Sequence, residues 1–149
     1  NKDSKRMILE TALMCMALNM YHEAKNQSML GQIAVGQVVM NRVEDNRFPD
    51  NVCDVVTEAV TYKGTNKPVL HQCQFSWWCD GQKDEPDFDS KEWWKAQEYA
   101  SIVLSGTIML DVTEGATHYH ATYVRPSWTK TKTKTTRIDR HIFYRWEKK

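Results

Sequence analysis

Apolar side chains near the start of the chain recur at the spacing of one helix face. They are Leu9, Leu13, Met16 and Met20, at steps of four, three and four residues. Side chains at these steps lie on the same side of an α-helix, and a helix of this kind buries that side against its neighbours. The sequence therefore predicts a core helix that is capped by Asp3 or Ser4 and runs to about Lys25.

Glu23 lies three residues beyond Met20 and continues the same face. Burial removes water from a carboxylate, which raises its pKa toward the range in which it can donate a proton at neutral pH. The alternative is a solvated Glu near a helix end, where the helix dipole does not favour a negative charge. The apolar face favours an inward or cleft-facing carboxylate, and Glu23 is therefore a candidate general acid.

Further helices are expected over about residues 28–43, 50–60 and 90–105, the last of them ended by a glycine. Gly31 and Gly36 lower the helix propensity of the first of these, which indicates close approach of another backbone. The fold class is therefore expected to be α+β and mainly α.

Residues 61–92 are rich in Gly, Pro and polar side chains, and we expect them to form a long, largely irregular and functional segment. Near the C-terminus, "ATHYHATYV" and "TKTKTKTTRIDRHIFYRW" favour a small antiparallel hairpin or sheet. The alternation of Lys and Thr resembles a phosphate-binding ribbon, but it is more typical of a solvated strand or loop.

The composition bounds the classes of function. A chain of 149 residues with 41% hydrophobic residues is expected to form a single domain, residues 1–149. A net charge of +1 gives no global field toward nucleic acid or an anionic membrane. The apolar run at residues 11–18 is too short for a membrane span, and residues 1–6 lack the features of a signal peptide, although an export signal lost by processing fits the non-Met start.

Four cysteines allow several arrangements. Cys15 lies in the apolar helix and is predicted to be a buried thiol, whereas Cys73 and Cys79 flank "QFSWW" and could close that loop in an oxidising compartment. Cys53 could pair instead. Zinc is a weaker interpretation of the Cys73 and Cys79 pair, because no second motif completes a set of four ligands.

His118 and His120 share one side of a predicted strand, and Tyr119 faces the other. The two histidines are a possible metal pair, which His22, His141 or Asp139 could complete in a zinc amidase or peptidase. No HExxH motif supports that class. We expect instead that one side of this strand lines a cleft and the other packs.

The aromatic residues permit a third class, a glycan-binding module without catalysis. Trp77 and Trp78 offer flat faces to sugar rings, although Trp at this density is as often part of a core. Trp93 and Trp94 are predicted to be packing residues. A pure binding module would leave Glu23 without a role.

Four segments, in this order, resemble the SleB/CwlJ-type cell-wall hydrolases, which are spore-cortex-lytic enzymes and their bacterial and phage relatives. They are "YHEAKNQSMLGQIAVGQVVMNRVEDNRFPDNVCDVV", "CQFSWWCDG", "ATHYHATYVRPSW" and "RIDRHIFYR", and the resemblance covers roughly residues 10–145. It implies a lysozyme-like, lytic-transglycosylase-like fold that acts on the glycan strands of peptidoglycan. The acid of the family's Y-x-E-A motif corresponds to Glu23.

The same resemblance suggests roles for other residues. Gln74, Phe75 and Ser76 correspond to the family's Q-F-S segment, whose polar groups would border the cleft, with Ser76 orienting the substrate's N-acetyl group. The alternative for Ser76 is a loop serine that bonds its own backbone. The remaining candidates for substrate binding are Trp77, His118, Tyr119 and His120.

The predicted reaction is cleavage of the β-1,4 bond between N-acetylmuramic acid and N-acetylglucosamine without metal or cofactor. The motifs contain no obvious second carboxylate, with Asp80 and Glu44 the first candidates for one that is missed, and a lytic transglycosylase needs none. Hydrolytic muramidase or glucosaminidase action on the same fold is the alternative. The expected site of action is the cell wall, for an exported enzyme or a phage lysin, and the sequence does not indicate an oligomeric state.

Overall fold

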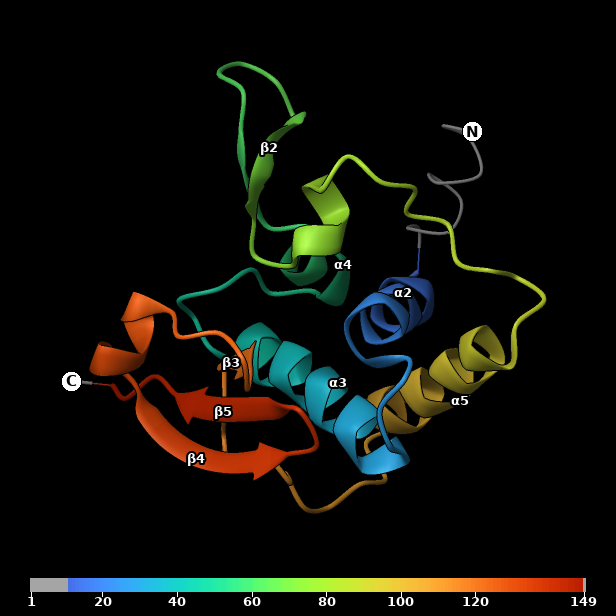
Figure 1. Ribbon diagram of the computed structural model, residues 1–149, viewed down its shortest axis with the longest axis vertical. Helices are drawn as coiled ribbons and strands as arrows, with labels where there is room; N and C mark the ends of the chain where they lie inside the picture. Colours follow the sequence, from blue (N-terminus) through green and yellow to red (C-terminus); the bar gives the residue numbers. More distant parts are fainter. Residues whose placement is uncertain (1–10, 149) are drawn as a thin grey trace.

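The computed structural model describes residues 11–148 as a helical body with two small antiparallel sheets (Figure 1). The helices are α2 (Ala12–Ala24), α3 (Met29–Glu44), α4 (Val52–Val56) and α5 (Lys91–Ser105), with 3-10 turns η1 (Ser76–Cys79) and η2 (Ser127–Thr131). The strands are β1 (Ala59–Thr61), β2 (Pro68–Cys73), β3 (His118–Ala121), β4 (Thr133–Ile138) and β5 (His141–Arg145). The predicted α+β, mainly α class is confirmed.

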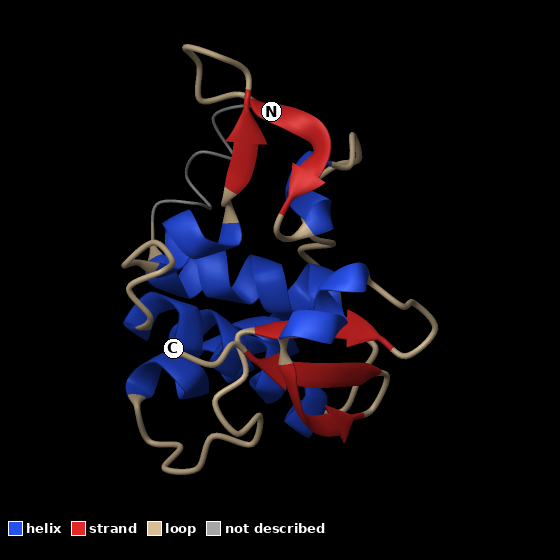
Figure 2. Ribbon diagram, turned by 90° about the vertical axis from the view of Figure 1, so that its left-hand side faces the viewer, coloured by secondary structure: helices blue, strands red, loops and turns tan. Residues whose placement is uncertain are grey.

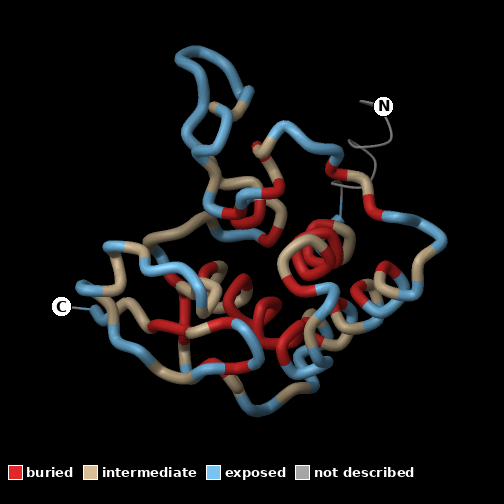
Figure 3. The backbone as a smooth tube through the Cα atoms, in the orientation of Figure 1, coloured by how far each residue is buried: buried red, intermediate tan, exposed pale blue. Residues whose placement is uncertain are grey.

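Helix α2 is the centre of the core and packs against α3, α4 and α5. It begins at Ala12 because the Thr11 hydroxyl accepts a hydrogen bond from Met14 N, and the predicted caps at residues 3 and 4 lie outside the described residues. Met16 and Met20 are fully buried, as the apolar face predicts. The helix is buried beyond that face too, since all of residues 15–21 are buried (Figure 3).

The other helices follow their local signals closely. Helix α3 begins after Ser28, whose hydroxyl accepts from Gly31 N, and α5 ends at Gly106, which adopts a left-handed φ of 74°. A Cβ at Gly36 would lie 3.0 Å from a Val103 methyl group and 3.2 Å from Met20 Sδ, so the expected close approach is real but comes from side chains. Trp93 is buried, whereas Trp94 is 66% exposed, so the packing role predicted for Trp94 is wrong.

The four cysteines form two disulfides, which decides between the arrangements that the sequence allowed. Cys15 bonds to Cys53, which ties α2 to α4, so the prediction of a buried free thiol at Cys15 is wrong. Cys73 bonds to Cys79 and closes the loop between β2 and η1. The second pair is the one that the short spacing allowed.

Residues 61–92 were expected to be largely irregular, but part of this segment forms a regular hairpin. Helix α4 ends at Val56, and the chain then forms the antiparallel hairpin of β1 and β2, so the helix predicted to reach residue 60 is too long. This hairpin projects from the helical body, apart from the second sheet (Figure 2). Its strands are mostly exposed, because little apolar surface packs against them.

The second sheet has the strand order β3-β5-β4 and contains the predicted C-terminal hairpin. Phe143 is fully buried and packs with Ala34 and Val38 of α3, which seats the sheet on that helix. Lys134 is exposed, as expected for a solvated strand. The two-residue turn between β4 and β5 places Asp139 at a φ of 51°, a left-handed conformation that Asp tolerates better than most residues.

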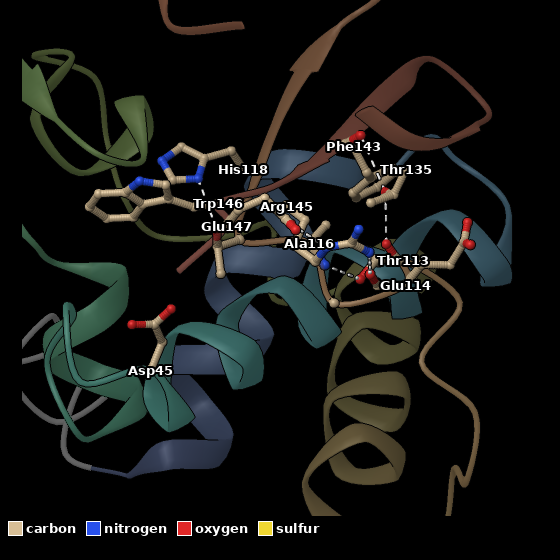
Figure 4. Close-up of polar contacts among 12 residues, drawn as sticks. Asp45, Thr113, Glu114, Ala116, His118, Thr135, Phe143, Arg145, Trp146 and Glu147 are labelled. Atoms are coloured by element: carbon tan, nitrogen blue, oxygen red, sulfur yellow. Dashed lines mark hydrogen bonds and ion pairs between the residues drawn. The ribbon is translucent and has the colours of Figure 1, made fainter. Parts of the chain in front are cut away.

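The loop before β3 is bonded to the same sheet (Figure 4). The Thr135 hydroxyl donates to the Thr113 carbonyl oxygen at 2.8 Å, and Arg145 Nη1 donates to the Glu114 carbonyl oxygen at 3.1 Å. The Thr113 hydroxyl in turn accepts from Ala116 N at 3.2 Å. These bonds fix the start of β3, and therefore which of its side chains face the helices.

No helix within residues 11–148 is both long enough and apolar enough to cross a membrane.

Candidate active site

Glu23 lies in the last turn of α2 and lines a cavity of about 600 Å³. Its side chain is partly buried. The other residues of the cavity come from the α2–α3 connection, the end of β3 and the β4–β5 turn: His22, Ala24, Lys25, Asn26, Gln27, Ser28, Ala121, Tyr123, Asp139, Arg140 and His141. A half-buried carboxylate therefore faces a polar space large enough for sugar units.

Tyr119 donates a hydrogen bond from its hydroxyl to Glu23 Oε1. Arg42 lies behind the pair, where its guanidinium donates to the Thr117 carbonyl oxygen at 2.7 Å and to Gln74 Oε1 at 3.2 Å. The side chain of Arg42 is buried, and its ring neighbours are Phe48 and Phe75 at 4.9 and 5.2 Å. One buried cation thus connects the acid's surroundings to both the β3 segment and the β2–η1 loop.

Burial dominates the electrostatics of this group. Loss of water raises the pKa of Glu23, while the Tyr119 hydrogen bond and the Arg42 charge oppose the rise. Burial, together with the nearby Glu23 carboxylate, raises the pKa of Tyr119 well above its usual value, so Tyr119 keeps its proton and remains a donor. Burial lowers the pKa of Arg42. The net rise increases the protonated fraction of Glu23 at a given pH, and the protonated form is the one that general acid catalysis needs.

Some of the "QFSWW" residues are exposed and others are buried. Gln74 and Ser76 are exposed, and Phe75 is buried beneath the Arg42 guanidinium. Trp77 is 4% exposed, so its faces are covered: its indole donates to Asn19 Oδ1 at 2.9 Å and stacks on His22 at 4.8 Å. The geometry gives Trp77 a packing role beside the cavity rather than the predicted open face for a sugar.

Strand β3 alternates as predicted. Tyr119 faces Glu23, whereas His118 and His120 pack against Trp128 at 5.3 and 5.7 Å between ring centres. Burial and the Arg42 charge lower the pKa of His118 to about 4. Neither histidine lines the cavity, and no three His, Cys, Asp or Glu side chains within residues 11–148 are grouped to hold a metal ion.

Two cavity residues were not predicted to bind substrate, although they lie in the segments quoted for the family: Gln27 was not singled out, and His141 was considered only as a metal ligand. Gln27 Nε2 lies 3.2 Å from His141 Nδ1, and the His141 ring lies 4.6 Å from that of Tyr119. Burial lowers the pKa of His141, so this neighbour of Tyr119 favours its neutral form. The available signal was their position: Gln27 lies three residues after "YHEA", and His141 lies within "RIDRH".

The cavity also contains a second carboxylate, which the sequence analysis considered only as a possible metal ligand. Asp139 lines it, whereas Asp80 and Glu44 do not. Asp139 Oδ2 accepts from Ser28 N at 2.9 Å and from the Ser28 hydroxyl at 2.6 Å. This contact joins the β4–β5 turn to the start of α3, and a Cβ at Gly31 would collide with the same oxygen at 2.4 Å.

Replacing Tyr119 with Phe should move the pH profile of catalysis upward. The hydrogen bond stabilises the ionised carboxylate, so its removal raises the Glu23 pKa further. Because a general acid loses activity as pH rises through its pKa, the alkaline limb of kcat/KM should shift to higher pH. Rates of peptidoglycan cleavage across pH test this shift; an unmoved limb would show that Tyr119 does not tune the acid.

Comparison with known proteins identifies the family. Residues 26–144 match the Cell Wall Hydrolase family, a match that begins just after Glu23. No curated protein matches the chain. The catalytic domain of the Bacillus cereus SleB protein is 25% identical, with a TM-score of 0.67 over 90% of this chain and 89% of that one. The catalytic domain of the germination-specific lytic transglycosylase SleB from Bacillus anthracis is 24% identical, with a TM-score of 0.67 over 91% and 95%. The chain therefore belongs to the cell wall hydrolase family and has the fold of the SleB catalytic domains.

Proposed function

We propose that this protein cleaves the β-1,4 bond between N-acetylmuramic acid and N-acetylglucosamine in peptidoglycan, as a lytic transglycosylase. The observation that carries the proposal is Glu23, a carboxylic acid with a raised pKa that faces a polar cavity of about 600 Å³. Family membership supports the substrate class, as does the similarity to SleB from Bacillus anthracis, which is a germination-specific lytic transglycosylase. Gln74 and Ser76, which are exposed but do not line this cavity, are proposed to contact the glycan where it extends beyond it.

In the first step Glu23 protonates the glycosidic oxygen as the bond to muramic acid C1 breaks. Tyr119 donates to Oε1, so the acid's proton belongs on the other oxygen, Oε2, which is the atom that would meet the substrate. Tyr119 and Arg42 then stabilise the carboxylate that remains. The substrate's own N-acetyl group is proposed to stabilise the cationic sugar carbon.

In the second step the Glu23 carboxylate takes the proton of the 6-hydroxyl of the same muramic acid, whose oxygen closes a 1,6-anhydro ring. Proximity favours this hydroxyl because it belongs to the same ring. Asp139 is the rival base for an attacking water, but its Oδ2 accepts two hydrogen bonds from Ser28. The alternative function is hydrolytic muramidase action with Asp139 as the second acid, or glucosaminidase action on the other bond.

Products of digestion distinguish these reactions. Muropeptides from purified peptidoglycan should end in 1,6-anhydro-N-acetylmuramic acid, about one water lighter than hydrolysed products and resistant to borohydride reduction. Mass spectrometry before and after reduction measures this. Reducible muramic acid ends as the main product would contradict ring closure and direct attention to Asp139. Reducible N-acetylglucosamine ends would mean that the other glycosidic bond is cut.

The proposed place of action is the cell wall outside the cytoplasm. The disulfides Cys15–Cys53 and Cys73–Cys79 support this, because such bonds persist in oxidising compartments. Peptidoglycan strands are the proposed partner.

A further inference from the structure

Within residues 11–148, two cations at the cavity have no carboxylate partner. Lys25 and Arg140 both line it, both side chains are exposed, and within residues 11–148 the ion pairs are Arg47–Asp45 and Arg145–Glu147. Lys25 Nζ lies 4.6 Å from the centre of the Tyr21 ring, so its ammonium is placed but not neutralised. Because neither cation takes part in an ion pair among the described residues, both charges are available to a ligand.

The acidic groups of the cavity cancel only part of this charge. The Asp139 carboxylate, which accepts from Ser28, offsets one of the two positive charges, whereas burial favours the neutral form of Glu23. His22 and His141 favour their neutral forms because burial lowers the pKa of each. The cavity that holds the acid is therefore positive when Glu23 is ready to donate.

The two cations come from two different segments that line the cavity. Lys25 follows Glu23 by two residues at the end of α2, and Arg140 lies in the β4–β5 turn, where its carbonyl oxygen accepts from Thr122 N at 2.9 Å. Because Glu23 lines the same cavity, a sugar that binds there beside the acid can reach both cations. In peptidoglycan that sugar is muramic acid, whose lactyl group is either a free carboxylate or the attachment point of a stem peptide with its own carboxylates.

We propose that Lys25 and Arg140 bind the carboxylate carried by the muramic acid beside the scissile bond and so select anionic glycan strands. This rests on the proposed function and names the substrate feature that its site recognises. Two cations that approach one group from different chain segments position it as well as attract it. Uncharged strands, such as chitin oligosaccharides, should bind more weakly.

The test is the double variant Lys25→Gln and Arg140→Gln, compared with Lys130→Gln and Lys134→Gln, which removes two exposed charges that do not line the cavity. At low salt the first variant should raise KM about tenfold, since two partly exposed ion pairs contribute about 1.4 kcal/mol in total. Its kcat should stay within about twofold, because neither cation contacts the reacting atoms. The control variant should leave both constants unchanged.

Two substrates separate the sources of the carboxylate. Strands stripped by an amidase carry the free lactyl carboxylate, whereas intact strands carry the stem peptide. A KM effect confined to intact strands assigns the peptide carboxylates, and an effect on stripped strands assigns the lactyl group. An unchanged KM on both, or an equal effect in the control variant, overturns the proposal.

Binding without turnover keeps this test separate from the proposed function. With Glu23→Gln added to each protein to prevent cleavage, the affinity of labelled strands for the otherwise wild-type chain and for both double variants can be measured by fluorescence anisotropy at two salt concentrations. The Lys25 and Arg140 variant should bind more weakly and with a smaller salt dependence. If the wild type cleaves neither substrate, the proposed function fails, while equal affinities would overturn the role of the two cations on their own.

Discussion

Replacing Glu23 with Gln is expected to remove most of the peptidoglycan-cleaving activity while the fold survives. An amide cannot donate a proton at neutral pH, and general acid catalysis contributes roughly 10²–10⁴-fold. Because the proposed mechanism uses Glu23 in both steps, the loss should lie at the upper end of that range. Gln keeps an oxygen that can accept from Tyr119. Release of soluble muropeptides from purified peptidoglycan measures the effect.

Glu44→Gln is the matched control, because this exposed Glu of α3 does not line the cavity. It should retain the wild-type rate, and thermal unfolding of both variants should match that of the wild type. Substantial turnover by the Glu23 variant would refute its assignment as the acid and would make Asp139 the next carboxylate to replace.

The disulfide between Cys15 and Cys53 is expected to contribute the largest single share of stability. Replacing both with Ala should lower the free energy of unfolding by about 3–4 kcal/mol, since the bond closes a loop with a sequence separation of 38. For a chain of this size that corresponds to a fall in Tm on the order of 10 °C. Thermal unfolding without reductant checks the prediction.

The other disulfide gives an internal comparison. Cys73–Cys79 closes a separation of only 6, so its removal should cost about 2 kcal/mol. Its loop carries Gln74, which Arg42 bonds, and therefore this smaller loss should be accompanied by a larger fall in activity measured well below the unfolding temperature. Equal stability losses in the two double variants would contradict the loop-length explanation.

Local signals predicted the helices because helices form from local contacts. The expected range 28–43 differs from α3 by one residue at each end, since Ser28 and the apolar spacing both act within the segment. Gly106 ended α5 for the same reason. The hairpin of β1 and β2 was missed because its strands are mostly exposed and so lack a regular apolar alternation.

The candidate acid could be predicted from the sequence, but its surroundings could not. The apolar face and the Y-x-E-A motif both led to Glu23, which lies at the cavity. Tyr119 was placed on the correct strand, yet its bond to Glu23 depends on how β3 docks on α2 and α3. The pairing of Cys15 with Cys53 likewise depends on the position of α4, which periodicity does not specify.

The distance along the chain between Glu23 and Tyr119 also orders events during synthesis. The two residues are 96 positions apart, and the strand that pairs with β3 follows later still. When α2 through α5 have been synthesised, Glu23 is therefore already present in the chain, but Tyr119, which bonds to it, has not yet been made. The environment of the Glu23 carboxylate is complete only once β5 has paired with β3. A nascent chain, or one truncated before β5, therefore carries Glu23 without that environment.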